Sequence, residues 1–378
     1  MRIEYVATCL FGLEHLLGEE IDALGFTRLS TIDGRITFAG EESACARANV
    51  FLRYAERVYI RVGGFRAESF DQLFEGVRAL PWELWIGRED AFPVKGHSVK
   101  SRLFSIPDCQ KIIKRAVVAH LSDRYGLLRF PETGVRVQIE FFLLRDEATL
   151  MIDTSGDPLH KRGYRTEANA APLRETLAAA VASIARPREE VLLWDPLCGS
   201  GTIAIEAAMR MRGIAPGARR RFAGEELRAL PRPIWEEARE EARSGEHPSD
   251  FEVYASDIDP ACVELTRRNA ARAGVADTVH SFVCDARTLE KPDRRGTIVT
   301  NPPYGERLME REEVEELYRA LGRRFIALSP WQVYILTSHP GFERLYGRRA
   351  DKTRKLYNGM IPCYLYQFFK NNTRERDK

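Results

Sequence analysis

The stretch "TNPPYGERL", residues 300–308, follows a short β-branched run and combines an amide, two prolines and a tyrosine. The side-chain oxygen of Asn301 and the carbonyl of Pro302 can both accept hydrogens from one planar amino group, and proline has no N–H to compete as a donor. The Tyr304 ring can stack on a flat base, a contact worth about 1–3 kcal/mol. Two acceptors on an exocyclic amine favour a pyramidal, nucleophilic nitrogen. The motif therefore predicts a site that positions such an amine for attack on a nearby electrophile.

Acidic residues end three consecutive predicted strands. The segments "VLLWDPLCGSGT", "VYASDIDP" and "SFVCDA" place them at Asp195, Asp257 and Asp285. In an open parallel sheet, ligands bind beyond the carboxyl ends of the strands, so the three carboxylates are expected to converge on one crevice. The glycines of the loop Gly199–Gly201 let the backbone approach a ligand and turn into a helix whose N-terminus presents free N–H groups.

These positions suit different parts of one amino-acid-bearing nucleoside. The Asp257 carboxylate can accept hydrogen bonds from both ribose hydroxyls, and the Asp285 carboxylate can accept one from an adenine amino group. The Ala286 N–H can donate a hydrogen bond to the adenine ring. The loop after Asp195 suits an ammonium and a carboxylate. It lacks the G-x-x-x-x-G-K-[ST] pattern and departs from G-x-G-x-x-G, which argues against nucleoside triphosphates and dinucleotides. The sequence therefore predicts S-adenosylmethionine as the cofactor. A further acid, Asp259, precedes Pro260 and is expected to be a helix N-cap, not a cofactor ligand.

The alternation of predicted strands and helices in the second half of the chain indicates an α/β fold with a mostly parallel, doubly wound sheet. Asp195 and Asp257 lie much further apart in sequence than the spacing of about 20 residues that is typical of a compact unit. Residues 212–250 are therefore expected to be an insertion. The expected parts are an α+β unit at 1–60, a second α+β unit at 61–160, a linker at 161–171, the α/β domain at 172–370 and a frayed tail at 371–378.

The middle of the chain is basic, although the net charge of the whole is only +2. Residues 95–165 carry 13 Lys and Arg against 8 Asp and Glu, a local charge of +5. Such clustering suits a polyanion, although a charge run can also cover an ordinary solvated face, and Lys111, Lys114 and Arg115 at helical spacing fit either interpretation. The candidate RNA-binding residues are Lys95, Lys100, Arg102, Lys111, Lys161, Arg162 and Arg165.

Other classes of protein are disfavoured. The seven cysteines are scattered without a C-x-x-C, and no histidines have the spacing of a metal-ligand pair, which argues against a disulfide framework and a structural metal site. The chain has neither a long apolar run nor a signal-peptide pattern. We therefore expect a cytoplasmic protein that binds no metal and no membrane. The sequence leaves the oligomeric state open.

The motifs together resemble those of a known family. The segments are "DPLCGSGT", "SDIDP", "CDA", "NPPYGERL", "FPVKGHSVKSRLFSIPDCQKIIKRAVVAHL" and "IDTSGDPLHKRGYR". They resemble the THUMP-domain-containing RNA guanine-N2 methyltransferases, above all the large-subunit (23S) ribosomal RNA enzyme, over nearly the whole chain. The resemblance implies a ferredoxin-like unit, a THUMP domain that engages RNA, and a class I (Rossmann-like) methyltransferase domain with a seven-stranded sheet.

The resemblance also implies roles for individual residues. The implied cofactor-binding residues are Asp195, Pro196, Cys198, Gly199, Ser200, Gly201, Thr202, Asp257, Ile258, Asp285 and Ala286. The implied catalytic residues are Asn301, Pro302, Pro303 and Tyr304. Some relatives carry a second methyltransferase behind the first, and since this sequence ends after one, a single activity is expected.

Three alternatives stay open at the level of sequence. N-P-P-Y alone fits adenine N6, cytosine N4 or a glutamine amide equally well, so guanine N2 rests on the resemblance. THUMP domains also serve transfer RNA enzymes, which makes a tRNA guanine-N2 methyltransferase the second reading. The third is a non-catalytic RNA-binding or ribosome assembly factor, against which the intact Asn301, Tyr304, Asp257 and Asp285 argue.

Overall fold

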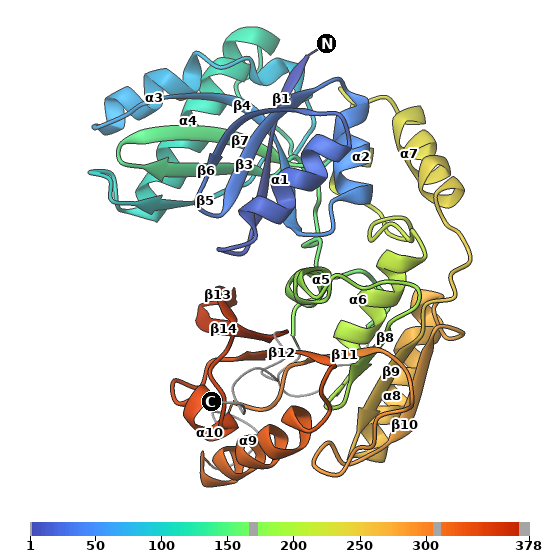
Figure 1. Cartoon of the computed structure of the whole chain (residues 1–378). Coiled ribbons are helices and arrows are strands. Elements are labelled where there is room, and N and C mark those ends of the chain that lie inside the picture. The colour runs from blue at the N-terminus through green and yellow to red at the C-terminus, as the bar shows by residue number, and fades with distance from the viewer. Residues whose placement is uncertain (1, 166–172, 305–310, 370–378) are drawn as a thin grey trace. The chain divides into compact units, whose positions relative to one another are not determined.

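The computed structural model describes residues 2–165, 173–304 and 311–369. The chain forms two compact units, each built around a seven-stranded sheet (Figure 1). The first unit comprises Met1–Cys9, Leu17–Leu159 and Arg220–Glu241, and the second comprises Leu10–Leu16, His160–Arg219 and Ala242–Lys378. Residues 166–171 of the expected linker and the expected tail 371–378 lie outside the described residues.

The sheet of the first unit has the strand order β2-β3-β1-β4-β7-β6-β5, in which only β5 and β6 pair in parallel. Its strands are β1 (Ile3–Cys9), β2 (Thr27–Ile32), β3 (Arg35–Gly40), β4 (Ala55–Arg66), β5 (Val94–Val99), β6 (Ile139–Leu144) and β7 (Glu147–Asp153). The 12-residue strand β4 pairs with β1 along its first half and with β7 from Tyr59 onward. The expected boundary between residues 60 and 61 therefore falls inside one continuous strand, and the two α+β sections share one sheet.

Helices accompany this sheet. They are α1 (Glu14–Ala23), α2 (Ser43–Phe51), α3 (Phe70–Arg78) and α4 (Ile106–Tyr125), with a 3₁₀ turn at Trp82–Leu84. Helix α4 begins two residues before the expected Asp108, because Pro107 suits the first turn, where its missing N–H costs nothing. Gly126 ends the helix in the left-handed conformation, with φ 67°. The buried face repeats at helical spacing through Cys109, Ile113, Ala116, Val117 and Leu121.

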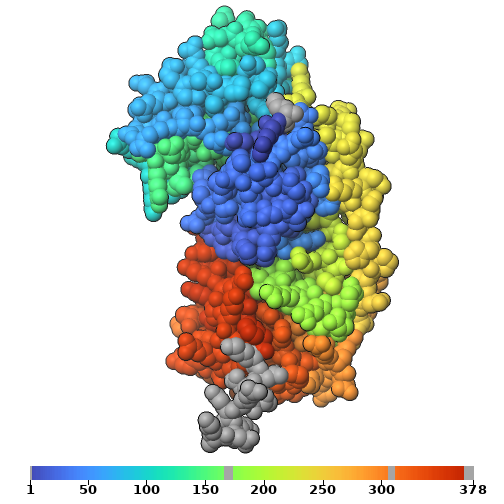
Figure 2. Space-filling view, turned by 45° about the horizontal axis from the view of Figure 1, so that its top comes forward, coloured from blue at the N-terminus to red at the C-terminus, as the bar shows by residue number. Residues whose placement is uncertain are grey.

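The expected insertion at residues 212–250 contributes to the first unit. Its segment Arg220–Glu241 contains a 3₁₀ turn, Ala223–Glu226, and most of helix α7 (Pro233–Ser244). Arg47 of α2 donates two hydrogen bonds of 2.8 Å to the carboxylate of Glu241, and the N–H of Gly224 donates to the Thr154 carbonyl at 2.8 Å. Figure 1 shows α7 beside α2, and Figure 2 shows the yellow segment lying against the blue N-terminal one. A segment that interrupts the second unit in sequence is thus part of the first.

The second unit has the strand order β10-β9-β8-β11-β12-β14-β13. The pairs from β10 through β12 are parallel, whereas β14 is antiparallel to both β12 and β13. The strands are β8 (Leu192–Asp195), β9 (Val253–Asp257), β10 (Val279–Val283), β11 (Gly296–Thr300), β12 (Gln332–Thr337), β13 (Lys352–Asn358) and β14 (Ile361–Phe368). This mostly parallel, seven-stranded α/β sheet confirms the predicted fold class.

The helices of the second unit connect its strands. They are α5 (Glu175–Ile184), α6 (Thr202–Met211), α8 (Pro260–Ala273), α9 (Arg311–Ile326) and α10 (Phe342–Tyr346). Asp259 caps α8 by accepting a hydrogen bond from the N–H of Ala261, with Pro260 in the first turn, as predicted. Between α9 and the sheet lies a core of buried aromatic side chains that includes Trp194, Tyr318 and Phe325. Burial of this apolar surface holds α9 against one face of the sheet. The carboxyl ends of the strands are not part of this packed face.

Two absences concern the residues that the structure describes. Among them, no helix has the length and apolar character needed to cross a bilayer. Nor do the described His, Cys, Asp and Glu side chains gather anywhere into a group of three or more that could bind a metal ion.

Candidate active site

The ends of four parallel strands meet at one edge of the second sheet. Strand β8 ends at Asp195, β9 at Asp257 and β11 at Thr300, directly before Asn301. Asp285 follows the end of β10 by two residues. Because these strands run in the same direction, their carboxyl ends form one rim, which is where open α/β sheets bind ligands. The structure thus brings the predicted cofactor acids and the N-P-P-Y motif to the same rim.

Asp195 connects the two motifs. Its side chain is 2% exposed, and its Oδ1 accepts hydrogen bonds from the Thr300 hydroxyl at 2.7 Å and from the Leu197 N–H at 3.3 Å. Burial raises the pKa of the Asp195 carboxyl to about 7, although the hydrogen bond from Thr300 lowers it. A buried carboxylate of this kind gains stability when a cation arrives, so Asp195 fits the ammonium of an amino-acid ligand.

The loop between β8 and α6 turns on its glycines. Gly199 has φ 54° and Gly201 φ 79°, conformations that side chains rarely adopt. A Cβ on Gly201 would lie 2.6 Å from the Thr266 methyl, so the close approach also requires glycine. The N–H of Gly199 donates to Asp257 Oδ2 at 3.0 Å. The loop therefore joins the end of β8 to the end of β9 and presents backbone at the start of α6.

Two polar residues of α8, which the sequence analysis missed, hold this loop from behind. The Thr266 hydroxyl donates to the Gly199 carbonyl at 3.0 Å, and the Asn269 amide donates to the Ser200 carbonyl at 3.0 Å. Both side chains are fully buried. Their spacing of three residues on the apolar face of a helix was the available signal, because a buried polar group needs a fixed partner.

The remaining predicted loop residues are enclosed. Pro196, Cys198, Ser200 and Thr202 are all buried, and the hydroxyls of Ser200 and Thr202 lie 3.1 Å apart. Burial raises the pKa of the Cys198 thiol well above its ordinary value, so the thiol stays protonated. A protonated, buried thiol is a poor nucleophile. Burial therefore disfavours Cys198 as a nucleophile.

Two exposed aliphatic side chains lie at the ends of β9 and β10, close in sequence to Asp257 and Asp285. Ile258 is 59% exposed and Val283 is 54% exposed, and Val283 pairs with Asp257 across the two strands. Exposed aliphatic side chains flanked by carboxylates suit the faces of a purine ring. The carboxylate of Asp285 accepts hydrogen bonds from Arg287, whose guanidinium and N–H lower the pKa of that carboxyl. Asp285 is thus ionised and fixed in orientation, and Ala286 beside it is buried.

The N-P-P-Y motif is fixed by residues from other elements. Tyr318 of α9 donates to the Pro303 carbonyl at 2.8 Å and lies 2.8 Å from the Thr337 hydroxyl at the end of β12. The Tyr304 hydroxyl donates to Asn301 Oδ1, and burial raises the pKa of that phenol, which keeps it a neutral donor. Sequence reasoning missed Tyr318, because a tyrosine on an amphipathic helix gives no signal of its partner.

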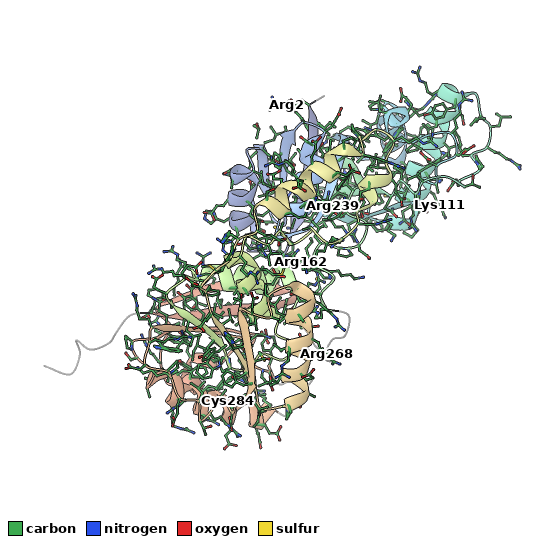
Figure 3. The ribbon with its side chains drawn as sticks, turned by 90° about the vertical axis from the view of Figure 1, so that its right-hand side faces the viewer. Arg2, Lys111, Arg162, Arg239, Arg268 and Cys284 are labelled. Atoms are coloured by element: carbon green, nitrogen blue, oxygen red, sulfur yellow. The ribbon has the colours of Figure 1, made fainter. Side chains whose placement is uncertain are left out.

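Two of the predicted RNA-binding arginines are directed into the second unit. Arg162 has a side chain 2% exposed, with Nε 3.4 Å from Glu206 Oε1, and Figure 3 places it among the helices of this unit. Arg165 donates to Glu175 at 3.1 Å and to the Thr202 hydroxyl at 3.3 Å, and its side chain is 11% exposed. Burial against carboxylates speaks against contact of either guanidinium with RNA phosphates. Lys161 is exposed.

The other predicted RNA-binding residues lie at the surface of the first unit. Lys95, Lys100, Arg102 and Lys111 are all exposed. Arg102 pairs with Glu68 at 2.5 Å, and Lys111, labelled on α4 in Figure 3, lies 3.9 Å from Asp108. Exposed ion pairs of this kind are weak, so these side chains can exchange their partners for phosphates.

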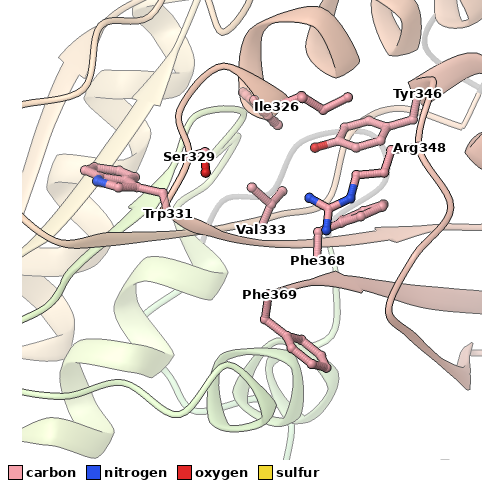
Figure 4. A pocket seen from close by; sticks show the side chains of 9 residues that line it. Ile326, Ser329, Trp331, Val333, Tyr346, Arg348, Phe368 and Phe369 are labelled. Atoms are coloured by element: carbon pink, nitrogen blue, oxygen red, sulfur yellow. The ribbon is translucent and has the colours of Figure 1, made fainter. Parts of the chain in front are cut away.

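A separate pocket of the second unit lies at the opposite edge of the sheet (Figure 4). Its walls include Trp331 and Val333 at the start of β12, Phe325 near the end of α9, and Phe368 at the end of antiparallel β14. Because β12 runs from this pocket toward Thr337, the pocket is not part of the rim that carries the acids and N-P-P-Y.

Comparison with known families agrees with the arrangement of the rim. The family model "RMKL-like, methyltransferase domain" matches residues 162–367, "RlmL ferredoxin-like domain" matches 4–59, and "THUMP domain" matches 67–153. The chain belongs to the RMKL-like methyltransferases. Membership in this THUMP-containing family confirms the resemblance seen in the sequence and the predicted cofactor, S-adenosylmethionine.

Individual RMKL-like relatives are similar over the whole chain. "Putative RNA methyltransferase YpsC" of Bacillus subtilis (strain 168) is 40% identical over 99% of this chain and 97% of its own length. "Ribosomal RNA large subunit methyltransferase K/L" of Syntrophotalea carbinolica is 35% identical over 97% of this chain, which spans only 53% of that protein. The solved structure described as "SMU.472, a putative methyltransferase complexed with SAH" superposes with a TM-score of 0.91 at 39% identity and 99% coverage of both chains.

Proposed function

We propose that this protein transfers a methyl group from S-adenosylmethionine to the exocyclic N2 amine of a guanosine in 23S ribosomal RNA. The observation that carries the enzymatic part is the hydrogen bond from Thr300 to Asp195, at 2.7 Å. It joins the end of the cofactor strand to the residue directly before Asn301. A methyl donor held by the Gly199–Gly201 loop and an amine held by Asn301 would therefore be neighbours, which is the proximity that methyl transfer requires.

The residues of the rim fit the cofactor. Asp195 would hold the ammonium, the start of α6 the carboxylate, Asp257 the ribose hydroxyls and Asp285 the adenine amine. A Cβ on Gly201 would collide with Thr266, so the loop can pack this closely only with glycine at this position. The buried carboxyl of Asp195 gains a partner when a cation binds. Bound S-adenosylmethionine supplies an electrophilic methyl group on a sulfonium.

Asn301 and Pro302 prepare the nucleophile. The Asn301 side-chain oxygen and the Pro302 carbonyl accept the two hydrogens of the target amine, which favours a pyramidal nitrogen with an available lone pair. Tyr304 donates to the same Asn301 oxygen and leaves the second lone pair of that oxygen for the amine. Asn301 and Pro302 would hold this nitrogen beside the methyl group that bound S-adenosylmethionine would supply, and the new nitrogen–carbon bond would replace the carbon–sulfur bond, whose electron pair would stay on sulfur. The nitrogen then loses a proton to water, so no strong base is required.

Relatives and surface charge both favour ribosomal RNA as the substrate. The names of the K/L relatives specify large-subunit ribosomal RNA, and the family resemblance favours guanine N2. An RNA substrate also suits the exposed cations Lys95, Lys100, Arg102 and Lys111 of the first unit. Adenine N6 or cytosine N4 would fit the same pair of acceptors, and a transfer RNA would suit the same cations.

Mass mapping of modified nucleosides tests this proposal. Ribosomal and transfer RNA from cells with and without the protein would be digested and compared. The proposal expects one N2-methylguanosine in 23S ribosomal RNA to disappear with the protein and to return when purified protein, S-adenosylmethionine and that RNA are combined. Loss of a methyl group from transfer RNA instead, or an unchanged set of nucleosides, would overturn it.

A further inference from the structure

Residues 100–105, which we call the Phe104 loop, connect the edge strand β5 to helix α4 in the first unit. The backbone N–H of Arg102 donates to Asp146 Oδ1 at 2.7 Å. The N–H of Asp146 in turn donates to the Ser101 hydroxyl at 3.0 Å. This reciprocal pair fastens the loop to the turn between β6 and β7, so the loop has a defined backbone.

The loop buries one apolar side chain and exposes the next. Leu103 is 6% exposed, and its carbonyl accepts a hydrogen bond from the Ser98 hydroxyl at 2.7 Å. Phe104, by contrast, is 79% exposed. Covering an exposed aromatic ring with a partner lowers the free energy, because apolar surface is removed from water. A fixed backbone keeps the entropic cost of that contact low. Phe104 is therefore presented as a contact surface.

Cations lie on the Phe104 loop and on the adjoining β6–β7 turn. Lys100 has a left-handed backbone, with φ 51°, and the N–H of Arg145 donates to the Val99 carbonyl at 3.2 Å, which brings the β6–β7 turn beside Lys100. Neither Lys100 nor Arg145 lies within ion-pair distance of any acid among the described residues. Arg102 pairs with Glu68, but its side chain is 69% exposed. The Phe104 loop and the adjoining β6–β7 turn thus combine an exposed ring with two cations, Lys100 and Arg145, that lack an acidic partner in the described structure.

We propose that the Phe104 loop binds an unpaired stretch of RNA, with Phe104 stacked on one base and Lys100 and Arg145 on the flanking phosphates. Aromatic rings bordered by cations recognise single strands in this way, because every unpaired base has a face to stack and every nucleotide a phosphate. A paired base has no free face. This inference rests on the proposed RNA methyltransferase function and adds that the bound segment is single-stranded at this loop.

The test compares two variants of Phe104 in the full chain. The probe is a short single-stranded RNA that contains 2-aminopurine, whose fluorescence is quenched by stacking, and the reference is a duplex RNA of the same length. Phe104→Ala should weaken single-strand binding by roughly 5- to 150-fold and abolish quenching. Phe104→Trp should restore both. Lys100→Ala and Arg145→Ala should each reduce the slope of log affinity against log salt by about 0.7, whereas Phe104→Ala should leave that slope unchanged.

Leu128→Ala is the matched control. Leu128 is an apolar residue that is even more exposed than Phe104, at 96%. It lies beyond the other end of the 20-residue helix α4, about 30 Å along its axis. It should leave single-strand binding unchanged.

Three results would overturn the inference. In the first, Phe104→Ala weakens duplex binding as much as single-strand binding. In the second, quenching is unchanged in that variant. In the third, the substitution changes self-association of the protein and leaves RNA affinity unchanged. If the unmodified protein binds neither probe, the proposed RNA function fails as a whole. Retained RNA binding without a Phe104 effect removes only this loop.

Discussion

The buried carboxyl of Asp195 makes cofactor affinity depend on pH. Its pKa is raised to about 7 by burial, and only the ionised form can pair with the ligand's ammonium. With a pKa of about 7, about nine-tenths of the protein would carry a protonated Asp195 at pH 6 and about one-tenth at pH 8. We therefore expect the affinity for S-adenosylhomocysteine to fall about tenfold from pH 8 to pH 6, as measured by calorimetry.

The sign of the effect follows from linkage. The folded-state pKa of Asp195 lies above the value of about 3.9 for an unfolded chain, so the folded protein binds this proton more tightly. The contribution of Asp195 to stability is therefore most favourable at low pH and is lost as pH rises from about 4 to about 7. Cofactor binding has the opposite dependence, because the ammonium replaces the proton as the partner of the carboxylate.

Two variants separate Asp195 from other titrating groups. In Asp195→Asn, the amide oxygen can still accept a hydrogen bond from Thr300, but the side chain cannot ionise. The affinity of this variant for S-adenosylhomocysteine should be weaker and should not depend on protonation at this position. The ratio of the two affinities cancels the titration of the ligand's own amine. Thr300→Val removes a hydrogen bond that lowers the pKa of Asp195, so the midpoint should move to higher pH. Parallel pH profiles for the unmodified protein and Asp195→Asn would refute the assignment of the ammonium to Asp195.

Two further predictions concern the cations. Replacing Lys95, Lys100 and Arg102 together by alanine should weaken RNA binding and lower the salt slope by up to about 2, and an unchanged slope in a filter-binding titration would exclude this surface. Arg165→Lys keeps the charge but loses the forked contacts to Glu175 and its neighbours, which should lower the free energy of unfolding by about 1–3 kcal/mol in denaturant titrations. RNA affinity should not change in Arg165→Lys, and a loss confined to RNA binding would return this residue to the RNA-binding surface.

The fold could be predicted where local pattern and topology agree. The alternation of strands and helices was enough to predict the parallel sheet, because neighbouring parallel strands need a crossover connection, which is usually a helix. The pairing of β4 with both β1 and β7 could not be predicted, because it depends on long-range contacts that leave no mark in a 12-residue run. The same holds for the segment Arg220–Glu241, whose place in the first unit depends on contacts such as Arg47 with Glu241.

The site was predictable to the extent that its residues follow strand ends. Asp195, Asp257 and Asn301 could be assigned to one rim because strand direction fixes where each one lies. The burial of Arg162 could not be foreseen from its turn-rich, basic surroundings. Its partner held the signal, since Glu206 lies in the apolar helix α6, where an acid needs a nearby cation.

The most direct test of the central claim separates catalysis from cofactor binding at Asn301. Asn301→Ala removes one of the two acceptors for the target amine and no group that faces the cofactor in our account. We expect methyl transfer to the RNA to fall at least about 100-fold, while the calorimetric affinity for S-adenosylhomocysteine stays unchanged. Asp257→Asn, by contrast, should weaken the affinity for S-adenosylhomocysteine. Methyl transfer by Asn301→Ala at the rate of the unmodified protein would contradict the account.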